Sequence, residues 1–186
     1  MNSELIHSLL VGVGLSAACG LRVFLPILAI SIGAGTGFFS PSSGFLWIGS
    51  SPALSIIAAA SVFELFAYAI SRMERFLDLV ATPAAMVAGT LLTAAALRDV
   101  HPLVGISVPL IVGGSVAGIS QSLISLMRLP PAAPAGGRRH LILAAFEAAA
   151  SLFLSALSIL LPAPAGLLVL VYLIVRWKSV REALTR

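Results

Sequence analysis

Long apolar runs, separated by short stretches of charged and turn-forming residues, follow one another along the whole chain. A helix that crosses the roughly 30 Å hydrocarbon core of a bilayer needs about 20 mostly apolar residues. Six runs have this character: Leu5 to Ile32, Pro52 to Ser71, Leu77 to Leu97, Pro102 to Met127, Leu141 to Leu161 and Pro164 to Val175. The pattern therefore predicts an all-α bundle of about six transmembrane helices, forming a single membrane domain over residues 1–186.

The composition agrees with this class. Of the 186 residues, 59% are hydrophobic and 10% are charged, whereas a soluble domain is about half apolar and about a quarter charged. These proportions exclude a soluble globule, and so little charge also excludes a disordered chain. The formal net charge of +4 lies between apolar runs instead of on one solvated face, so we expect no nucleic-acid partner.

Lysine and arginine segregate to one side of the predicted bundle. Six spans leave Arg22 inside the first run, place only Arg98 on one side, and place nine residues on the other: Arg72, Arg75, Arg128, Arg138, Arg139, Arg176, Lys178, Arg181 and Arg186. Because cytoplasmic loops are rich in Lys and Arg, both termini are expected to be cytoplasmic, with a tail over residues 178–186. No basic residue precedes the first run, unlike in a secretory signal, so this run is expected to be retained.

Three landmarks recur in the same order in the two halves of the chain. Gly14 to Gly20 aligns with Gly113 to Ile119, so that Ser16 falls on Ser115 and Arg22 on Gln121; Phe63-Glu64 aligns with Phe146-Glu147; Thr82 to Ala85 aligns with Ala163 to Gly166. Three spans per half force the second copy to enter the membrane the opposite way up. We therefore expect an inverted 3+3 repeat, about residues 5–98 and 102–177, which is a recurrent plan of secondary transporters.

The first and fourth runs are longer than one crossing and are rich in glycine and proline. These residues are Gly12, Gly14, Gly20 and Pro26 in the first run, and Pro109, Gly113, Gly114 and Gly118 in the fourth. Helices broken at such residues build substrate sites in inverted-repeat transporters. Small residues four positions apart also let helices pack closely without any ligand, so both interpretations stay open.

Arg22 lies deep in the first run. A charge inside the membrane costs at least about 2.5–3.5 kcal/mol on insertion scales, and a guanidinium keeps its proton, so Arg22 needs a carboxylate, a carbonyl, water or an anionic ligand. One interpretation is a site for an anion or a lipid phosphate. The alternatives are an ion pair with Glu64 or Glu147, or an outward reach to the interface.

Glu64 and Glu147 lie inside the second and fifth runs at repeat-equivalent positions. A carboxyl group in apolar surroundings is costly to ionise, so it can take up and release a proton at physiological pH. This indicates a proton-coupling pair. The alternative is that one or both acids neutralise Arg22 and lock helices together, although one arginine cannot fully pair with two acids.

Asp78, Thr82 and Pro83 form another cluster. Thr before Pro is typical of a helix start, whose positive end could face an anion; a plain cap at the cytoplasmic boundary has the same signature. The candidate substrate-binding residues are thus Arg22, Gln121, Ser16, Ser115 and Thr82, and the candidate proton-coupling residues are Glu64, Glu147 and Asp78.

Enzyme chemistry is not expected. His7, His101 and His140 lack the clustered spacing of a metal site, and the Gly-rich motifs that bind nucleotide phosphates are missing. Ser16 has no histidine partner in a readable motif. We therefore predict no metal, no cofactor and no catalytic residue.

Two segments, Gly14 to Pro26 (GLSAACGLRVFLP) and Ala81 to Thr90 (ATPAAMVAGT), resemble a family of bacterial membrane proteins known as domain of unknown function 4126. The likeness covers nearly the whole chain, and Arg22, Glu64, Asp78, Thr82 and Pro83 match its pattern. It implies a small multi-span protein of the bacterial inner membrane, and it implies no activity. The family pattern has a proline near Ser71, so the first cytoplasmic turn departs from it.

The repeat-equivalent acids and the intramembrane arginine lead to one functional expectation. The chain is predicted to be a small secondary transporter or lipid translocator, coupled to protons and handling an anionic substrate or a lipid phosphate. The alternatives are an ion channel and a non-transporting membrane scaffold. The expected partners are membrane lipids and a second copy of the chain.

Overall fold

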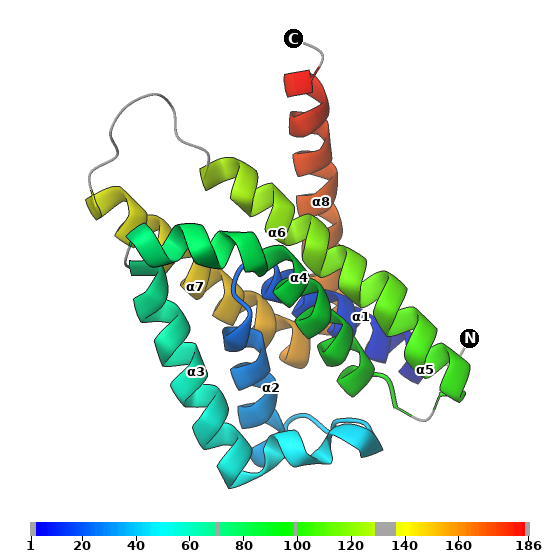
Figure 1. Cartoon of the computed structure of the whole chain (residues 1–186). Helices are drawn as coiled ribbons and strands as arrows, with labels where there is room; N and C mark the ends of the chain where they lie inside the picture. The colour runs from blue at the N-terminus through cyan, green and yellow to red at the C-terminus, as the bar shows by residue number, and fades with distance from the viewer. Residues whose placement is uncertain (1–2, 70, 99, 129–136, 185–186) are drawn as a thin grey trace.

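Helices account for most of the chain in the computed structural model, which describes residues 3–69, 71–98, 100–128 and 137–184, without the side chains of 68–69, 71–79, 126–128, 137–141, 176 and 179–184. The elements are α1 (Ser3–Cys19), α2 (Phe24–Gly35), the 3₁₀ helix η1 (Ser43–Gly49), α3 (Ser51–Ala69), α4 (Ser71–Ala96), α5 (Pro102–Val108), the π-helix η2 (Pro109–Gly113), α6 (Gly114–Arg128), α7 (Gly137–Leu160) and α8 (Pro162–Leu184) (Figure 1). The predicted all-α class is confirmed.

The first apolar run is two helices and not one, which corrects the predicted single span. Residues 20–23 are not helical, and the chain reverses its direction there. Along α1, each next residue lies beside a lower residue number of α7, and along α2 the neighbouring α7 numbers increase again. The neighbouring pairs are Gly14–Ser158, Ala18–Ser151, Arg22–Glu147 and Gly33–Ile159. We call residues 20–23 the break; α1 and α2 form a hairpin around it.

This reversal also changes where the N-terminus lies. Ser3 and Glu4, at the start of α1, line the same pocket as Arg98, which follows α4. Helix α8 packs on α1, with Gly166 against Leu10, and Figure 1 shows the two termini well apart. The sequence analysis expects the N-terminus and Arg98 on opposite sides of the bundle, whereas the start of α1 lies beside Arg98.

The fourth apolar run behaves differently from the first. Elements α5, η2 and α6 follow one another as one continuous rod across Figure 1. Its glycines serve close packing against α4: a Cβ on Gly113 would lie 2.6 Å from the carbonyl oxygen of Gly89, and a Cβ on Gly118 would lie 2.8 Å from Met86. Close packing thus holds for the glycines of both runs, as at Gly12 against Thr93, and the broken helix holds for the first run alone among the described residues.

Within the described residues, two helices have the length and apolar composition to cross a membrane, namely Pro102–Ser125 and Ile142–Leu160. A third candidate arises if η1 and α3, which meet at a 70° bend, are taken as one span. Four further apolar helices are shorter: Ser3–Cys19, Phe24–Gly35, Val80–Ala96 and Pro162–Val175. Six complete spans thus remain a prediction.

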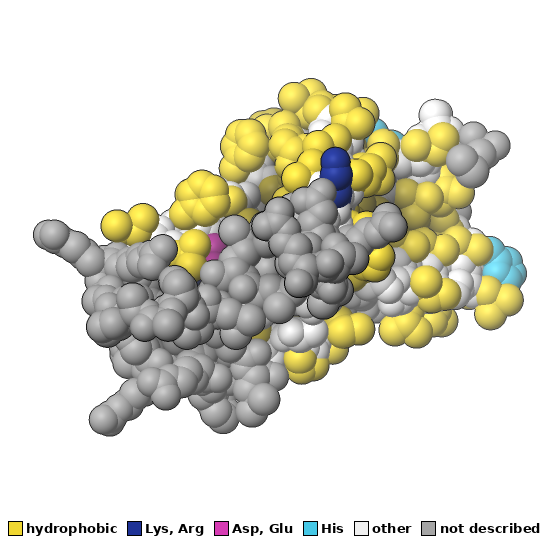
Figure 2. All heavy atoms as spheres, turned by 90° about the horizontal axis from the view of Figure 1, so that it is seen from above, with side chains coloured by type: hydrophobic (Ala, Val, Ile, Leu, Met, Phe, Trp, Pro, Cys, Tyr) yellow, Lys and Arg dark blue, Asp and Glu magenta, His cyan; other side chains and the backbone are white. Residues whose placement is uncertain are grey.

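Apolar side chains cover the outside, while small and polar ones fill much of the inside. Hydrophobic groups dominate the described part of the face in Figure 2. Exposed examples include Phe66, Phe146 and Trp177, whereas fully buried residues include Ser16, Thr93 and Ser155. This distribution is the opposite of that in a water-soluble bundle.

Thr82 and Pro83 do not begin a helix, contrary to one interpretation of the sequence. Both lie inside α4, which starts at Ser71 and continues to Ala96. The helix extends upstream of the apolar run into its charged flank, so the apolar boundary does not mark its end. Pro83 is exposed and Thr82 half-buried, and the side chain of Asp78 lies outside the described residues.

Candidate functional site at the break

Gly20 sets the position of the break against α6. A Cβ at this residue would collide with the side chain of Ser120 and would lie 2.7 Å from the carbonyl oxygen of Ala117. Only glycine therefore allows α1 to approach α6 this closely. Ser120 itself is fully buried, and its Oγ has no hydrogen-bond partner among the described residues.

Arg22 lies in the break and points toward α7. Its Nη2 atom is 3.0 Å from Oε2 of Glu147 and donates a hydrogen bond of 3.2 Å to the carbonyl oxygen of Ala144. The arginine and the glutamate are only 2% and 3% exposed. The ion pair proposed as one alternative for Arg22 is thus present, and its partner is Glu147.

Glu64 has a different task, because its carboxylate closes the N-terminal end of α2. Oε1 accepts the N–H of Val23 at 2.8 Å, and Oε2 accepts the N–H of Phe24 at 3.0 Å. These amides have no partner inside their own helix, and a carboxylate there also interacts with the positive end of the helix dipole. One acidic side chain from α3 therefore holds the start of α2.

Neighbouring hydroxyl groups fasten the same region. On α3, Ser61 Oγ donates to the carbonyl oxygen of Ile57 at 2.8 Å and lies 3.3 Å from that of Phe24. On α7, Ser151 Oγ donates to the carbonyl oxygen of Ala18 at 3.0 Å. The break is thus held on one side by α3 and on the other by α7.

Both glutamates bind groups at or next to the break, but they have different roles. Arg22 carries one positive charge, so the cluster of Arg22, Glu64 and Glu147 has a formal charge of −1 when all three are ionised. The positive end of α2, equivalent to about half an elementary charge, compensates part of this excess. Glu147 neutralises a side chain, whereas Glu64 neutralises a helix end.

The other predicted site residues lie elsewhere. Ser16 Oγ is 2.7 Å from Thr93 Oγ1 and donates to the carbonyl oxygen of Gly89 at 2.9 Å, at the crossing of α1 and α4. Ser115 is exposed on α6. Gln121 is buried beside Gly20 through its backbone, but its Nε2 donates to Ser125 Oγ at 3.4 Å.

Three contributors were missed from the sequence. Ser61 lies three residues before Glu64 and therefore on the same helix face, a spacing that could have revealed it. Thr93 and Ser151 are single hydroxyls inside apolar runs, and nothing in their local sequence separates them from serines that bond only within their own helix.

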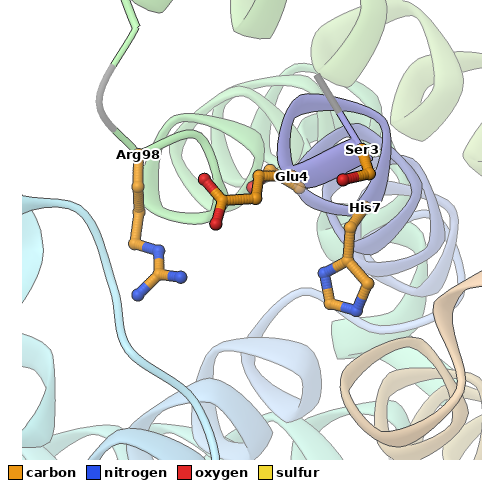
Figure 3. Close-up of a pocket in the computed structure, with 5 residues that line it drawn as sticks. Ser3, Glu4, His7 and Arg98 are labelled. Carbon is orange, nitrogen blue, oxygen red and sulfur yellow. The ribbon is translucent and has the colours of Figure 1, made fainter.

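Two apolar grooves flank α2, and only the one that Val23 lines reaches the break. One lies between α2 and α7 and the other between α2 and α4, each with a volume of about 480 Å³. A separate pocket of about 250 Å³ lies at the start of α1, where the carboxyl group of Glu4 points toward Arg98 beside His7 (Figure 3). Among the described residues, no group of three or more His, Cys, Asp or Glu side chains could hold a metal ion.

Comparison with known proteins confirms the resemblance seen in the sequence. Residues 9–182 match the family model described as Domain of unknown function (DUF4126). No curated protein and no solved structure is significantly similar to the chain. A function therefore has to be inferred from the geometry of the break.

Proposed function

We propose that this chain, which belongs to the DUF4126 family, is a small transporter or lipid translocator of the bacterial inner membrane that carries an anion together with protons. One observation carries the proposal. Arg22 and two buried acids meet where a short apolar helix begins inside the bundle. Discontinuous helices whose N-terminal ends face anionic groups recur at the substrate sites of secondary transporters.

The surface supports membrane embedding. Large apolar side chains are exposed on α3, α7 and α8, as at Phe63, Phe153 and Ile174, among others. Such a surface suits lipid, because exposed apolar patches of this extent are rare on soluble monomers. Of the non-helical residues of the break, Gly20 and Arg22 are buried and Leu21 and Val23 are half-buried, in keeping with the rule that irregular backbone inside a bilayer is covered by protein.

The basic residues support an orientation with the C-terminus in the cytoplasm and the N-terminus on the far side. Eight of the nine basic residues assigned to the cytoplasm lie near the ends of α3, α4, α6 and α7 that face away from Arg98, or in the later part of α8; Arg186 lies outside the described residues. The N-terminal segment carries no Lys or Arg, so moving it to the Arg98 side leaves the segregation unchanged. Positive loops on the cytoplasmic side are the usual arrangement.

We keep only part of the predicted inverted repeat in this proposal, namely the helices that carry the two glutamates and the helices that follow them. Glu64 lies in α3, which α4 follows, and Glu147 lies in α7, which α8 follows, so the order of elements around the two glutamates is the same. The α1–α2 hairpin has no counterpart of the same shape, since the corresponding run is a continuous rod. We therefore keep the repeat as a hypothesis for the two glutamate-bearing pairs.

The proposed transport step follows from the two positive groups that Glu147 and Glu64 bind in this structure. Glu147 is bound to Arg22, and Glu64 is bound to the first amides of α2; both of these positive groups are what an anionic substrate would need. Protonation removes the negative charge of a carboxylate and with it most of the charge-assisted bonding. A proton on each acid thus frees Arg22 and the helix end for the anion, and proton and anion move together.

Proton movement in reconstituted vesicles tests the proposal. Purified protein is placed in liposomes with a pH-sensitive dye, and small carboxylates, inorganic phosphate and phosphatidylglycerol are supplied in turn. We expect one of them to drive proton uptake, and we expect Glu64→Gln and Glu147→Gln to lower that uptake at least about tenfold, as for a lost proton-transfer group. Glu4→Gln, at the exposed start of α1, is the matched control and retains it. Unchanged uptake in both buried variants would refute coupling.

A scaffold is the second candidate, because each of the three buried charges has a bonding partner within the chain. Such a protein uses the ion pair and the cap only to hold its helices. It predicts no anion-driven proton uptake in the wild type, together with lower thermal stability in both glutamine variants.

A further inference from the structure

We infer that the connection between α2 and α3, residues 36–50, lies in the membrane–water interface on the Arg98 side and anchors the protein in that layer by its exposed aromatic and aliphatic side chains. The connection consists of the non-helical residues 36–42, the 3₁₀ helix η1 and Ser50. Its sequence contains no Asp, Glu, Lys, Arg or His. The inference rests on the membrane embedding proposed above and does not depend on transport.

The inner face of the connection is fixed to the ends of two helices. Ser42 donates its backbone N–H to the carbonyl oxygen of Ala95 at 2.8 Å, and its Oγ donates to the carbonyl oxygen of Ala94 at 3.0 Å. On α2, Ser31 Oγ donates to the carbonyl oxygen of Ile48 at 2.7 Å. These bonds hold the connection beside the C-terminal end of α4, and this end sets its side of the bundle.

The outer face presents large apolar side chains to the surroundings. Phe38, Leu46 and Trp47 are 77%, 64% and 59% exposed. Residues three apart share one face of a 3₁₀ helix, so Phe45 and Ile48 pack on the core while Leu46 and Trp47 point away from it. Exposing such side chains to water costs about 25 cal/mol per Å², and the connection has no charged group to offset this cost.

The depth of the connection in the bilayer is limited from two sides. Irregular backbone that faces lipid does not occur in the hydrocarbon region, and residues 36–38 and 40 are exposed without being helical. The exposed apolar side chains disfavour bulk water. The interfacial layer satisfies both conditions, because the backbone finds water there and Trp and Tyr rings are enriched at this depth.

The direction of η1 agrees with this depth. Helix α3 has 19 residues, so it is about 28 Å long and matches the hydrocarbon core of about 30 Å without any help from η1. The two helices meet at a bend of 70°, and Figure 1 shows the cyan segment passing across one end of the molecule. A helix that turns so far away from a crossing helix lies close to the membrane plane.

Quenching by brominated phospholipids measures the depth of a single tryptophan in the full chain, reconstituted in vesicles. Trp177→Phe leaves Trp47 as the only tryptophan. Two further reporters are placed in the Trp47→Phe/Trp177→Phe background. Gly44→Trp lies on the same face of η1 as Trp47, and a Cβ there meets nothing within 4 Å. Phe63→Trp, at a position that is 62% exposed and roughly 18 Å along α3, is the matched control for hydrocarbon depth.

We expect Trp47 and Gly44→Trp to lose most fluorescence to bromine close to the headgroup, and Phe63→Trp to lose most to bromine near the tail ends. The two η1 reporters should show the same depth profile, because they are level in a helix that lies in the membrane plane. If η1 instead continued the crossing of α3, their depths would differ by about 6 Å, which is three residues at about 2.0 Å each.

Four outcomes would overturn the inference. A clear difference in depth between the two η1 reporters, or strongest quenching of Trp47 from the tail ends, would place η1 in the hydrocarbon. Quenching of Trp47 by aqueous iodide but by no brominated lipid would place it in bulk water. Protection from both quenchers would mean that a protein partner or a second copy covers it. If Phe63→Trp also responds only to iodide, the chain is not embedded and the proposed function fails too; with Phe63→Trp quenched by lipid, only the anchoring role fails.

Discussion

Glu64 is the residue on which the geometry of the break depends most directly. Its two oxygens accept two consecutive backbone N–H groups at the start of α2. A side chain in this role usually comes from the residue just before the helix; here it comes from α3, about 40 positions later. The start of α2 is therefore tied to α3 by this carboxylate, together with the Ser61 hydroxyl 3.3 Å from the carbonyl oxygen of Phe24.

Replacing Glu64 by Gln should lower the stability of the protein. Glutamine keeps one acceptor oxygen and loses the charge, so one of the two bonds is lost or weakened, at a cost of about 1.5–3 kcal/mol for a charged hydrogen bond. Thermal unfolding in detergent measures this effect. Glu4→Gln serves as the control, and equal melting temperatures for the two variants would contradict the capping role.

The Arg22–Glu147 pair should show strong coupling between its members. Removing one partner leaves a buried charge, which costs about 3–5 kcal/mol, whereas replacing both by apolar residues is often nearly neutral. Arg22→Met and Glu147→Met should therefore each destabilise the protein more than the double variant does. Denaturation of the four proteins under one condition measures the coupling; simple addition of the two effects would argue against a buried pair.

Gly20 should tolerate no side chain. An alanine there would meet Ser120 and the carbonyl oxygen of Ala117, and overpacking of this kind costs about 1–3 kcal/mol. Gly44 offers a matched control, because a Cβ added to it would meet nothing within 4 Å. We expect Gly20→Ala to lower the melting temperature and Gly44→Ala to leave it nearly unchanged; similar melting temperatures would contradict the close approach.

The key residues of the site could be predicted from the sequence because they are charged. Arg22, Glu64 and Glu147 are charged residues deep within the apolar runs, so their meeting follows from the high cost of leaving any of them alone. Which acid pairs with the arginine could not be predicted, since it depends on how α3 and α7 pack. Ser16 and Ser115 were chosen by repeat alignment, which carries no information on packing.

At the scale of elements, the break was the feature that hydropathy could not reveal. Leu21 and Val23 are as apolar as their neighbours, and Gly20 is compatible with a helix kink or with close packing. What ends α1 and starts α2 is the set of bonds to Glu64 and Ser151, which lie far away in the sequence. Local periodicity therefore predicts the helices here, but not their directions.

Short apolar helices should make the protein prefer a thin bilayer. The apolar part of α8, Pro162–Val175, has 14 residues and a length of about 21 Å, against a hydrocarbon core of about 30 Å. Mismatch costs fractions of a kcal/mol per Å, so the deficit of about 9 Å amounts to a few kcal/mol.

Thermal stability in vesicles of defined thickness measures this preference. The protein should melt at a higher temperature in phosphatidylcholine with 14-carbon tails than with 22-carbon tails. An insertion of seven leucines after Val171 keeps the helix face and adds about 10 Å, which should move the optimum to thicker bilayers. No dependence on tail length in either protein would contradict the mismatch.

At the scale of the whole molecule, the predicted segregation of charge does not depend on where the N-terminus lies. The sequence predicts nine basic residues on one side and Arg98 on the other. The start of α1 lies beside Arg98, yet this placement moves no basic residue. Orientation in the membrane stays a prediction from loop charges, and the place of the N-terminus could not be predicted in this way, because its segment carries no Lys or Arg.

Cysteine labelling in intact cells can check this topology. The native Cys19 is fully buried, so it should not react. Ser3→Cys and Arg98→Cys should both react with a membrane-impermeant maleimide from outside, and Lys178→Cys should react only after the membrane is opened. Protection of Ser3→Cys alongside labelling of Arg98→Cys would place the N-terminus in the cytoplasm and contradict the hairpin.

Arg22 pairs with a residue that is synthesised much later, and this sets the order in which the protein can fold during synthesis. The hairpin leaves the ribosome first, but Glu147 follows about 125 residues later, which takes about 6–25 s at 5–20 residues per second. Until then Arg22 lacks its ion-pair partner Glu147. The first two helices therefore cannot take their final positions while the nascent chain is still at the insertion machinery. Completion of the penultimate helix is thus the step that releases a finished molecule.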